Sequence, residues 1–440
     1  MKPSLDTGRA TTFRSILALI LAILASTSMW FYVNHILVAH QIQDSLVSHT
    51  PRGNLSDLYP RWLGARELLL RGRNPYSPEI SAEIQTGYYG RPLDPARADD
   101  PKDVQAFAYP VYVVFLLAPL VRLPFHAVQF VFYWMLVLLS AVSVLLWLRA
   151  LSWRPSCVAI CSSMVLFLGC IPAVQGIKLQ QLTLLVAPLL AASAAAIVGG
   201  QLALGGILLA LATIKPQLAW PLVLWFLVWT AGDWRARRNL VIAFTAAMVL
   251  LLVGSEILLP GWIGMFLHAI RQYRMYTSSQ SVLDVSAGPF LGPALSALAV
   301  FACARRLWTL RSCPSGSAAF GYALALVMAL AVLVVPMIGP YNQVLLLPVV
   351  LEMLRGFAAN AARSRAFRFA ATACAAASAL PWIASLGLVA VYFLFSPALA
   401  MAAWKLPFAS TITLPILIFA LAIFRKPPTL LADPQAGSVV

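Results

Sequence analysis

One carboxylate, Asp57, stands among aromatic residues beyond the first long apolar run, which spans residues 13–38. It lies in the stretch 53-GNLSDLYPRW-62, and Tyr59 and Trp62 follow it closely. An aspartate near a membrane surface can take the proton from a sugar or lipid hydroxyl, which is general-base catalysis. A side chain at Ser56 or Asp57 could also cap a helix that begins at residue 58. The two interpretations are compatible, and Asp57 is the candidate catalytic residue.

Lys215 is the second chemical signal, because it stands between two apolar segments in 211-LATIKPQLAW-220. A lysine there is costly unless it has a partner or extends to the membrane surface. Pro216 breaks the helix at this point and leaves free backbone groups. A phosphate group would be a natural partner. Three further cations are predicted on the same outer face and could join Lys215 in binding phosphate: Lys178, Arg271 and Arg274.

Aromatic and amide side chains gather at the predicted outer ends of the apolar segments. Such groups can bind sugar rings and hydroxyls, although interfacial aromatic belts, turns and helix caps also account for them. The candidates for sugar or acceptor binding are Tyr59, Asn74, Tyr76, Tyr109, Gln181, Gln217, Tyr341, Asn342 and Gln343. The five histidines have no metal-ligand spacing, so we expect no metal site and no cofactor.

The composition is that of a polytopic membrane protein. Hydrophobic residues make up 61% of the 440 residues and charged residues only 10%, although the net charge is +16. Apolar runs of about 18 residues recur along the chain, and in hydrocarbon such runs must be helical. The basic residues form short clusters between these runs, which indicates cytoplasmic loops rather than nucleic-acid binding. The clusters are Lys2, Arg9 and Arg14; Arg235, Arg237 and Arg238; Arg305, Arg306 and Arg311; and Arg355, Arg363, Arg365 and Arg368.

The organisation follows from these segments. We expect a cytoplasmic tail at 1–12, a single transmembrane domain at 13–424 and a C-terminal tail at 425–440, with roughly 11–14 spans given the uncertainty of element boundaries. The predicted outer loop 39–106 contains an amphipathic helix that ends at Gly72 and lies in the membrane interface. Its apolar stripe is residues 58, 62, 65 and 69, with Arg61, Arg66 and Arg71 off that stripe.

Several motifs, in order, resemble glycosyltransferase family 87, from about residue 55 to about residue 350. They are D-x-Y at Asp57, G-x-N-P-Y at 72–76, Y-P at 109–110, Q-L-T-L-L at 181–185, I-K-P-Q at 214–217, the DWRARR cluster at 233–238 and P-Y-x-x-V-L-L-L-P at 340–348. Each motif alone is weak, whereas their order and spacing are fairly specific. Nucleotide, zinc-protease and serine-hydrolase signatures are missing from the sequence.

The resemblance implies an all-α polytopic membrane protein of the GT-C superfamily. Members of the family transfer mannose or arabinofuranose from a polyprenyl-phosphate donor to a lipid or glycan acceptor outside the cytoplasmic membrane. The acid in the first outer loop is the catalytic residue of that superfamily, and Asp57 matches it. Two departures stand out. Gln180 replaces the usual glycine, and Asn342 and Gln343 follow P-Y where relatives often carry histidine or aspartate.

We therefore expect an inverting, polyprenyl-phosphate-sugar-dependent glycosyltransferase of the cytoplasmic membrane, with its active site on the periplasmic or extracellular side. Its partners would be a polyprenyl-phosphate-linked sugar donor, a lipid or glycan acceptor and membrane lipids, and not nucleic acid. A transporter or flippase of lipid-linked glycans is the alternative. A transporter should place charges deep in opposed spans, whereas here the polar residues gather on one predicted face.

Overall fold

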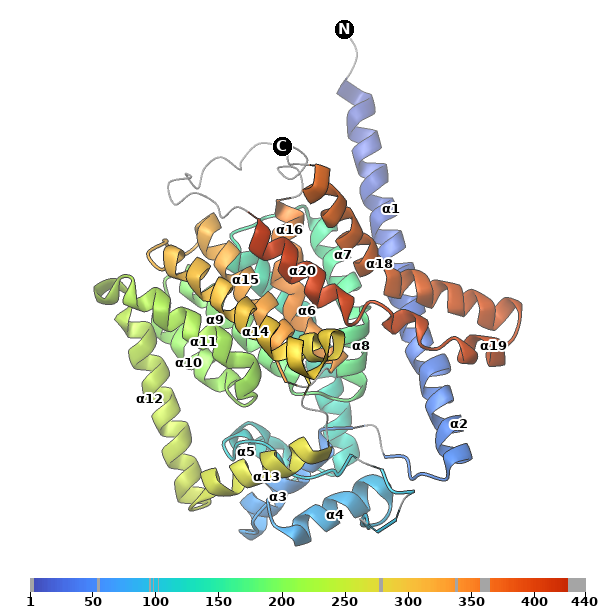
Figure 1. Ribbon diagram of the computed structural model, residues 1–440, viewed down its shortest axis with the longest axis vertical. Coiled ribbons are helices and arrows are strands. Elements are labelled where there is room, and N and C mark those ends of the chain that lie inside the picture. The colour runs from blue at the N-terminus through green and yellow to red at the C-terminus, as the bar shows by residue number, and fades with distance from the viewer. Residues whose placement is uncertain are drawn as a thin grey trace.

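The computed structural model describes residues 4–53, 56–94, 96–97, 99–101, 103–276, 280–336, 339–356 and 365–425. The protein is 79% helical, and these residues contain no strand. This confirms the predicted all-α polytopic class. Figure 1 shows a central group of helices, a separate layer of short helices at one end, and the N-terminus at the opposite end.

Six helical segments are long and apolar enough to cross a membrane, and one further pair is bent by 55°. The first segment runs from α1 (Ser4–Phe31) through a π-helical turn (Tyr32–Leu37) into α2 (Val38–Ser48), so the helix is longer than the predicted span 13–38. The others are α6 (Phe125–Ala150), α12 (Trp234–Leu258), α14 (Val282–Leu310), α18 (Arg365–Leu394), the stretch from α19 (Pro397–Ala402) through a 3-10 turn (Leu406–Phe408) to α20 (Thr413–Phe424), and the bent pair α7 (Cys157–Leu168) and α8 (Ile171–Lys178).

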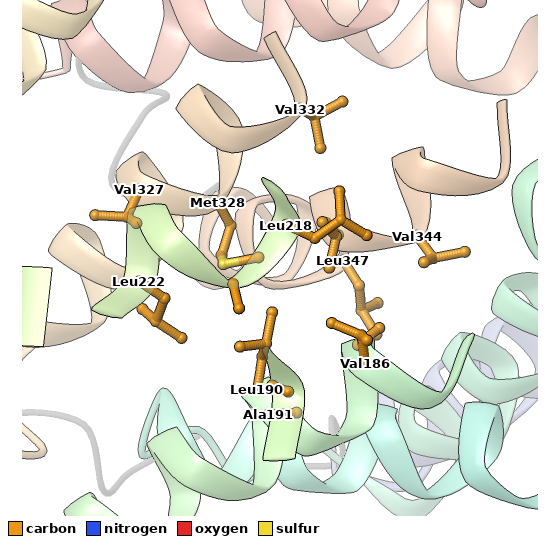
Figure 2. Packing of buried hydrophobic residues seen from close by; sticks show 14 of the residues in the cluster. Val186, Leu190, Ala191, Leu218, Leu222, Val327, Met328, Val332, Val344 and Leu347 are labelled. Carbon is orange, nitrogen blue, oxygen red and sulfur yellow. The ribbon is translucent and has the colours of Figure 1, made fainter. Parts of the chain in front are cut away.

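Four shorter apolar helices complete the centre of the fold: α9 (Thr183–Val198), α10 (Leu202–Ala212), α11 (Pro216–Ala231) and α15 (Ala318–Val334). Helix α15 is buried almost along its whole length, because α11, α14, α20 and the 3-10 helix η3 (Pro340–Leu346) pack around it. Figure 2 shows Leu190, Leu222 and Met328 meeting in this core. Helix α16 (Leu347–Arg355) continues directly from η3.

The end layer consists of α3 (Tyr59–Arg71), α4 (Pro78–Tyr89), the short α5 (Val113–Leu117) with the 3-10 turn η2 (Ala118–Leu120), and α13 (Trp262–Tyr276). In Figure 1 these helices lie together at the bottom, away from the N-terminus. The apolar segment at residues 107–122 does not form one long helix. It forms two short helical turns within this layer.

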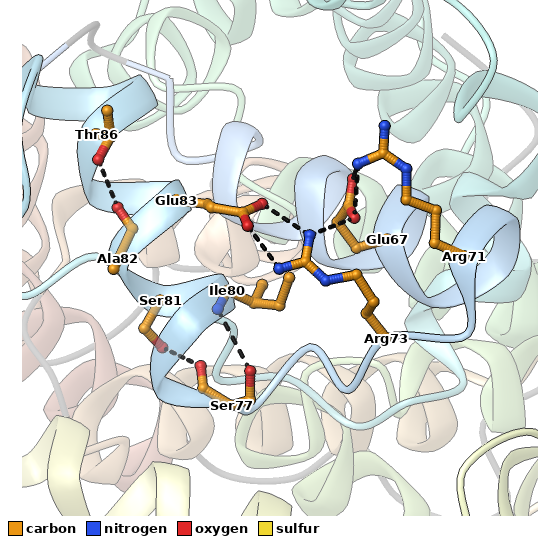
Figure 3. A network of polar contacts seen from close by, with 9 residues as sticks. All are labelled: Glu67, Arg71, Arg73, Ser77, Ile80, Ser81, Ala82, Glu83 and Thr86. Carbon is orange, nitrogen blue, oxygen red and sulfur yellow. Dashed lines mark hydrogen bonds and ion pairs between the residues drawn. The ribbon is translucent and has the colours of Figure 1, made fainter.

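Helix α3 confirms the predicted helix and its stop at Gly72, which has a left-handed φ of 65°. The predicted amphipathic pattern is wrong at Arg61, however, because that side chain is buried rather than exposed. Glu67, on the next turns, is also buried, and it forms ion pairs with Arg71 and Arg73 (Figure 3). Arg73 also forms an ion pair with Glu83 of α4. Tertiary packing holds the helix, together with ion pairs that join the buried Glu67 to the more exposed Arg71 and Arg73. A stripe in the sequence reveals neither.

Candidate active site

Asp57 lies in the turn before α3, where its backbone N–H donates to the carbonyl of Leu179 at 2.8 Å. Its side chain does not cap α3: the N-cap position is Leu58, and no side chain caps the helix. Instead, the amide nitrogen of Gln181 donates to Oδ2 of Asp57. The capping interpretation is therefore wrong for Asp57. Its carboxylate faces the 179–181 segment, more than a hundred residues away in the sequence.

Gln180 explains how the chain places Leu179 and Gln181 beside Asp57. Its φ is 52°, in the left-handed region that favours glycine. Its side chain accepts from Ser56 Oγ at 2.6 Å and donates to the carbonyl of Gln129 at 2.6 Å. These two hydrogen bonds offset the unfavourable backbone conformation. Gln180 thus holds a left-handed turn and links the segment before α3 to α6.

Lys215 is joined to Asp57 through Gln181. The Lys215 ammonium stands at the start of α11, only 6% exposed, and donates to Gln181 Oε1 at 2.9 Å and to Thr183 Oγ1 at 2.8 Å. Thr183 in turn donates to Asn342 Oδ1 at 3.0 Å. The partner that a buried lysine requires is thus a set of side chains from α9, η3 and the turn before α9.

A cavity of about 210 Å³ opens beside this network. Among the described residues, three cations line it, Arg61, Lys215 and Arg274, and Gln181 lines it too. Its aromatic wall is formed by Tyr109, Phe266, Tyr273 and Tyr341. A small cavity with cations, ring faces and an adjacent carboxylate is suited to a sugar that carries a phosphate.

The structure brings together only part of the predicted set. Tyr109, Gln181, Lys215, Gln217, Arg274 and Tyr341 line the cavity, and Asp57 and Asn342 adjoin it through Gln181 and Thr183. The remaining predicted residues do not line it: Lys178, Arg271, Tyr59, Asn74, Tyr76 and Gln343.

Most of these residues have other contacts within the fold. Tyr59 packs against Trp62 and Phe125, and Gln343 donates to the Thr411 carbonyl at 2.6 Å. Asn74 accepts from the backbone N–H of Tyr76 at 3.0 Å. The Tyr76 hydroxyl donates to the carbonyl of Tyr109 at 2.5 Å, so the Asn-Pro turn supports the cavity wall indirectly. Arg271 is exposed on α13.

Sequence reasoning missed Arg61, Tyr273 and Thr183 as site residues. Arg61 is 7% exposed; its guanidinium donates to the backbone carbonyl of Asp57 at 2.5 Å and lies 4.7 Å from the centroid of the Tyr109 ring. Its Nε has no hydrogen-bond partner among the described residues. The available signal was the position of Arg61 in the first turn of α3, four residues after Asp57.

Burial raises the pKa of Asp57 above the usual aspartate range. The neighbouring Arg61 and Lys215 charges and the Gln181 hydrogen bond lower that pKa, and the Asp103 charge raises it. A base with a raised pKa is a better proton acceptor once ionised. Among the described residues, no three His, Cys, Asp or Glu side chains gather as a metal site would require.

The family model of glycosyltransferase family 87 matches residues 107–336, more than half of the chain. The protein belongs to glycosyltransferase family 87. No curated protein and no solved structure matches the chain significantly. The matched region contains Tyr109, Gln181, Lys215 and Arg274 of the cavity, whereas Asp57 and Tyr341 lie on either side of it. A family 87 glycosyltransferase with several membrane-spanning helices is therefore the assignment that the comparison and the fold support together.

Proposed function

We propose that this glycosyltransferase moves a mannose-like or arabinofuranose-like sugar from a polyprenyl-phosphate donor to a hydroxyl of a lipid or glycan acceptor. The observation that carries the proposal is the placement of the Asp57 carboxylate beside a cavity lined by Arg61, Lys215 and Arg274. A base and a cluster of cations are the two features that such a transfer needs.

The donor side needs positive charge. As the bond between the anomeric carbon and the phosphate oxygen breaks, negative charge grows on the phosphate, and fixed cations stabilise it. Arg61 and Arg274 offer guanidinium groups, which bind phosphate oxygens in a bidentate geometry. Arg61 lines the cavity, and its buried Nε has no hydrogen-bond partner among the described residues. We assign these two arginines to the donor phosphate.

The acceptor side needs a base. The acceptor oxygen attacks the anomeric carbon, the phosphate leaves with the bonding electron pair, and the hydroxyl proton passes to the Asp57 carboxylate. A single displacement of this kind inverts the configuration at the anomeric carbon. Tyr109, Tyr341 and Gln217 line the cavity and would contact the sugar ring and its hydroxyls.

The polyprenyl tail would leave the cavity along α13. Phe266 and Ile270 of this helix line the cavity, while Ile263, Leu267 and Met275 are exposed on it. This gives apolar surface from the site towards the bilayer. Each methylene taken from water contributes about 0.8 kcal/mol, so a long tail binds without specific polar contacts.

The charge pattern supports an active site on the outer face of the cytoplasmic membrane. Arg235, Arg237 and Arg238 stand at the start of α12, and positive clusters of this kind favour the cytoplasm. Helix α12 is long enough to cross the membrane, and α13 follows its other end. The cavity, lined by α13, would therefore face outwards.

The test is a transfer assay with purified protein in proteoliposomes. Polyprenyl-phosphate mannose or polyprenyl-phosphate arabinofuranose is supplied with a total membrane lipid extract, and mass spectrometry seeks products heavier by one sugar residue. We expect such a product with one donor. If neither donor reacts while the lipid-linked sugar changes leaflet, the protein is a transporter and the proposal is wrong.

A further inference from the structure

The direction of the Gln181 amide is set by Lys215. An ammonium group only donates hydrogen bonds, whereas a glutamine side chain has one acceptor end and one donor end. Lys215 Nζ lies 2.9 Å from Oε1 of Gln181, so it holds the acceptor end. The donor end must then face Asp57, where the amide nitrogen contacts Oδ2. The three side chains form a chain of fixed polarity.

Lys215 has other contacts that fix it in this role. Its second hydrogen bond goes to Thr183 at 2.8 Å, and the rings of Tyr109 and Tyr341 flank it, with their centroids 5.8 Å and 5.3 Å from Nζ. Thr183 is itself tied to Asn342. Two of the three ammonium protons are therefore committed inside the protein.

We propose that Lys215 is a positioning residue that acts through Gln181: it orients the amide so that the amide donates to Asp57 and aims that carboxylate at the acceptor hydroxyl. This inference rests on the proposed role of Asp57 as the base. It separates the cations of the cavity into two groups. Arg61 and Arg274 bind the donor phosphate, and Lys215 serves the acceptor side.

The consequence for Asp57 is electrostatic as well as geometric. A donated hydrogen bond stabilises the ionised carboxylate. Without Lys215 the amide is free to turn its oxygen towards Asp57, which would favour the protonated acid. The other charged or titratable groups that act on Asp57 or respond to its charge come from α3, α4, α13, η3 and the loop before α5: Arg61, Tyr88, Tyr89, Tyr273, Tyr341 and Asp103.

A double-mutant cycle tests the proposal. Lys215→Met, Gln181→Leu and the double variant are compared for kcat, donor KM and pH profile, with Lys405→Met as the matched control far along the chain. We expect Lys215→Met to lower kcat by about tenfold or more, to change donor KM by less than about twofold and to move the acidic limb of the pH profile to higher pH. In the Gln181→Leu background, Lys215→Met should cost less than about twofold, because its route to Asp57 is already lost.

The opposite pattern would overturn the inference. If the two fold-losses multiply, or if Lys215→Met mainly raises the donor KM, Lys215 binds the donor directly. Thr183→Val removes the other hydrogen-bond partner of the Lys215 ammonium and leaves the Gln181 contact in place. The acidic limb of the pH profile of this variant should therefore match that of the wild type. An equal shift in this variant would indicate general disturbance of the site and would also sink the proposal.

A readout independent of turnover separates this inference from the proposed function. A water-soluble carbodiimide labels protonated carboxyl groups, and mass spectrometry follows the labelling of Asp57 as a function of pH. We expect the pH at which Asp57 is half labelled to be higher in Lys215→Met than in the wild type. If wild-type protein transfers no sugar but this shift is seen, the proposed function fails, while the orientation of the Gln181 amide towards Asp57 by Lys215 stands. An unchanged midpoint refutes the positioning role.

Discussion

The guanidinium of Arg61 lies over the ring of Tyr109, with its Cζ 4.7 Å from the ring centroid. Arg61 comes from α3 and Tyr109 from the loop before α5, so this contact joins two segments at the wall of the cavity. A guanidinium that stacks on an aromatic face keeps its N–H edge for two oxygens of an anion. The contact presents Arg61 to a phosphate without a carboxylate partner for its side chain among the described residues.

Arg61→Met should weaken the binding of the donor more than the binding of the acceptor. Charge-assisted hydrogen bonds contribute about 1.5–3 kcal/mol, so we expect the donor KM to rise by about tenfold or more. Arg61→Lys keeps the charge but cannot bind in the bidentate geometry, so its donor KM should lie between those of the wild type and Arg61→Met. Steady-state kinetics with varied donor concentration measures the effect.

Arg66→Met is the matched control for Arg61. Arg66 is on the same helix and its guanidinium lies over Trp62, at 5.3 Å, but it does not line the cavity. Its removal should leave the donor KM within about twofold of the wild-type value. Equal losses in both variants would show that the Arg61 effect comes from general weakening of α3.

Asp57→Asn should remove transfer with little change in structure. Asparagine keeps an oxygen that accepts from Gln181, but it cannot take the proton of the acceptor hydroxyl. General bases contribute about 10²–10⁴-fold, and we expect a loss of kcat in that range. Donor binding, measured by fluorescence with a polyprenyl-phosphate analogue, should be largely retained.

Asp94→Asn serves as the control for Asp57, since Asp94 is exposed and, among the residues that the structure describes, its carboxylate accepts from the backbone N–H of Ala96. It should transfer sugar at the wild-type rate. Appreciable turnover by the Asp57 variant would remove Asp57 from the role of base.

The pH profile should have an acidic limb governed by Asp57. Burial raises the pKa of this carboxyl, and only its ionised form accepts a proton. Activity should therefore fall as the pH drops through a value above the usual aspartate pKa, and Asp57→Asn should flatten that limb in the residual rate. The contribution of Asp57 to folding stability changes with pH in the opposite direction to the activity. The folded state binds this proton more tightly than the unfolded chain, so this contribution is present at low pH and is lost as the pH rises through the raised pKa.

Variants of Gln180 should separate the cost of its backbone conformation from the contribution of its side-chain hydrogen bonds to stability. Gln180→Ala keeps a non-glycine residue at a φ of 52° and loses the hydrogen bonds to Ser56 and Gln129. Gln180→Gly loses the same bonds but removes strain of about 1–2 kcal/mol. Thermal unfolding in detergent should rank the glycine variant above the alanine variant. The reverse order would mean that the turn is not strained.

The sequence alone predicts several of the helices, some of the helix ends and two candidate site residues. Local physical effects determine these features: apolar runs must become helices in hydrocarbon, Gly72 ends α3 because its φ is 65°, and Pro216 begins α11. The sequence predicts Asp57 as a site residue because a carboxylate among aromatic residues at a membrane surface can act as a general base. It predicts Lys215 because an amine between two apolar segments is costly without a partner. These conclusions depend on residue type and near neighbours only.

The tertiary structure decided how those residues are connected. Gln181 could be recognised as a polar residue at the end of a segment, but its two ends could not be assigned to Lys215 and Asp57 until three distant segments were placed together. The sequence places Arg61 off the apolar stripe of an amphipathic helix, whereas the structure buries it against the Asp57 carbonyl and the Tyr109 ring. Burial and long-range hydrogen bonds depend on packing between elements, and a pattern along one element does not contain that information.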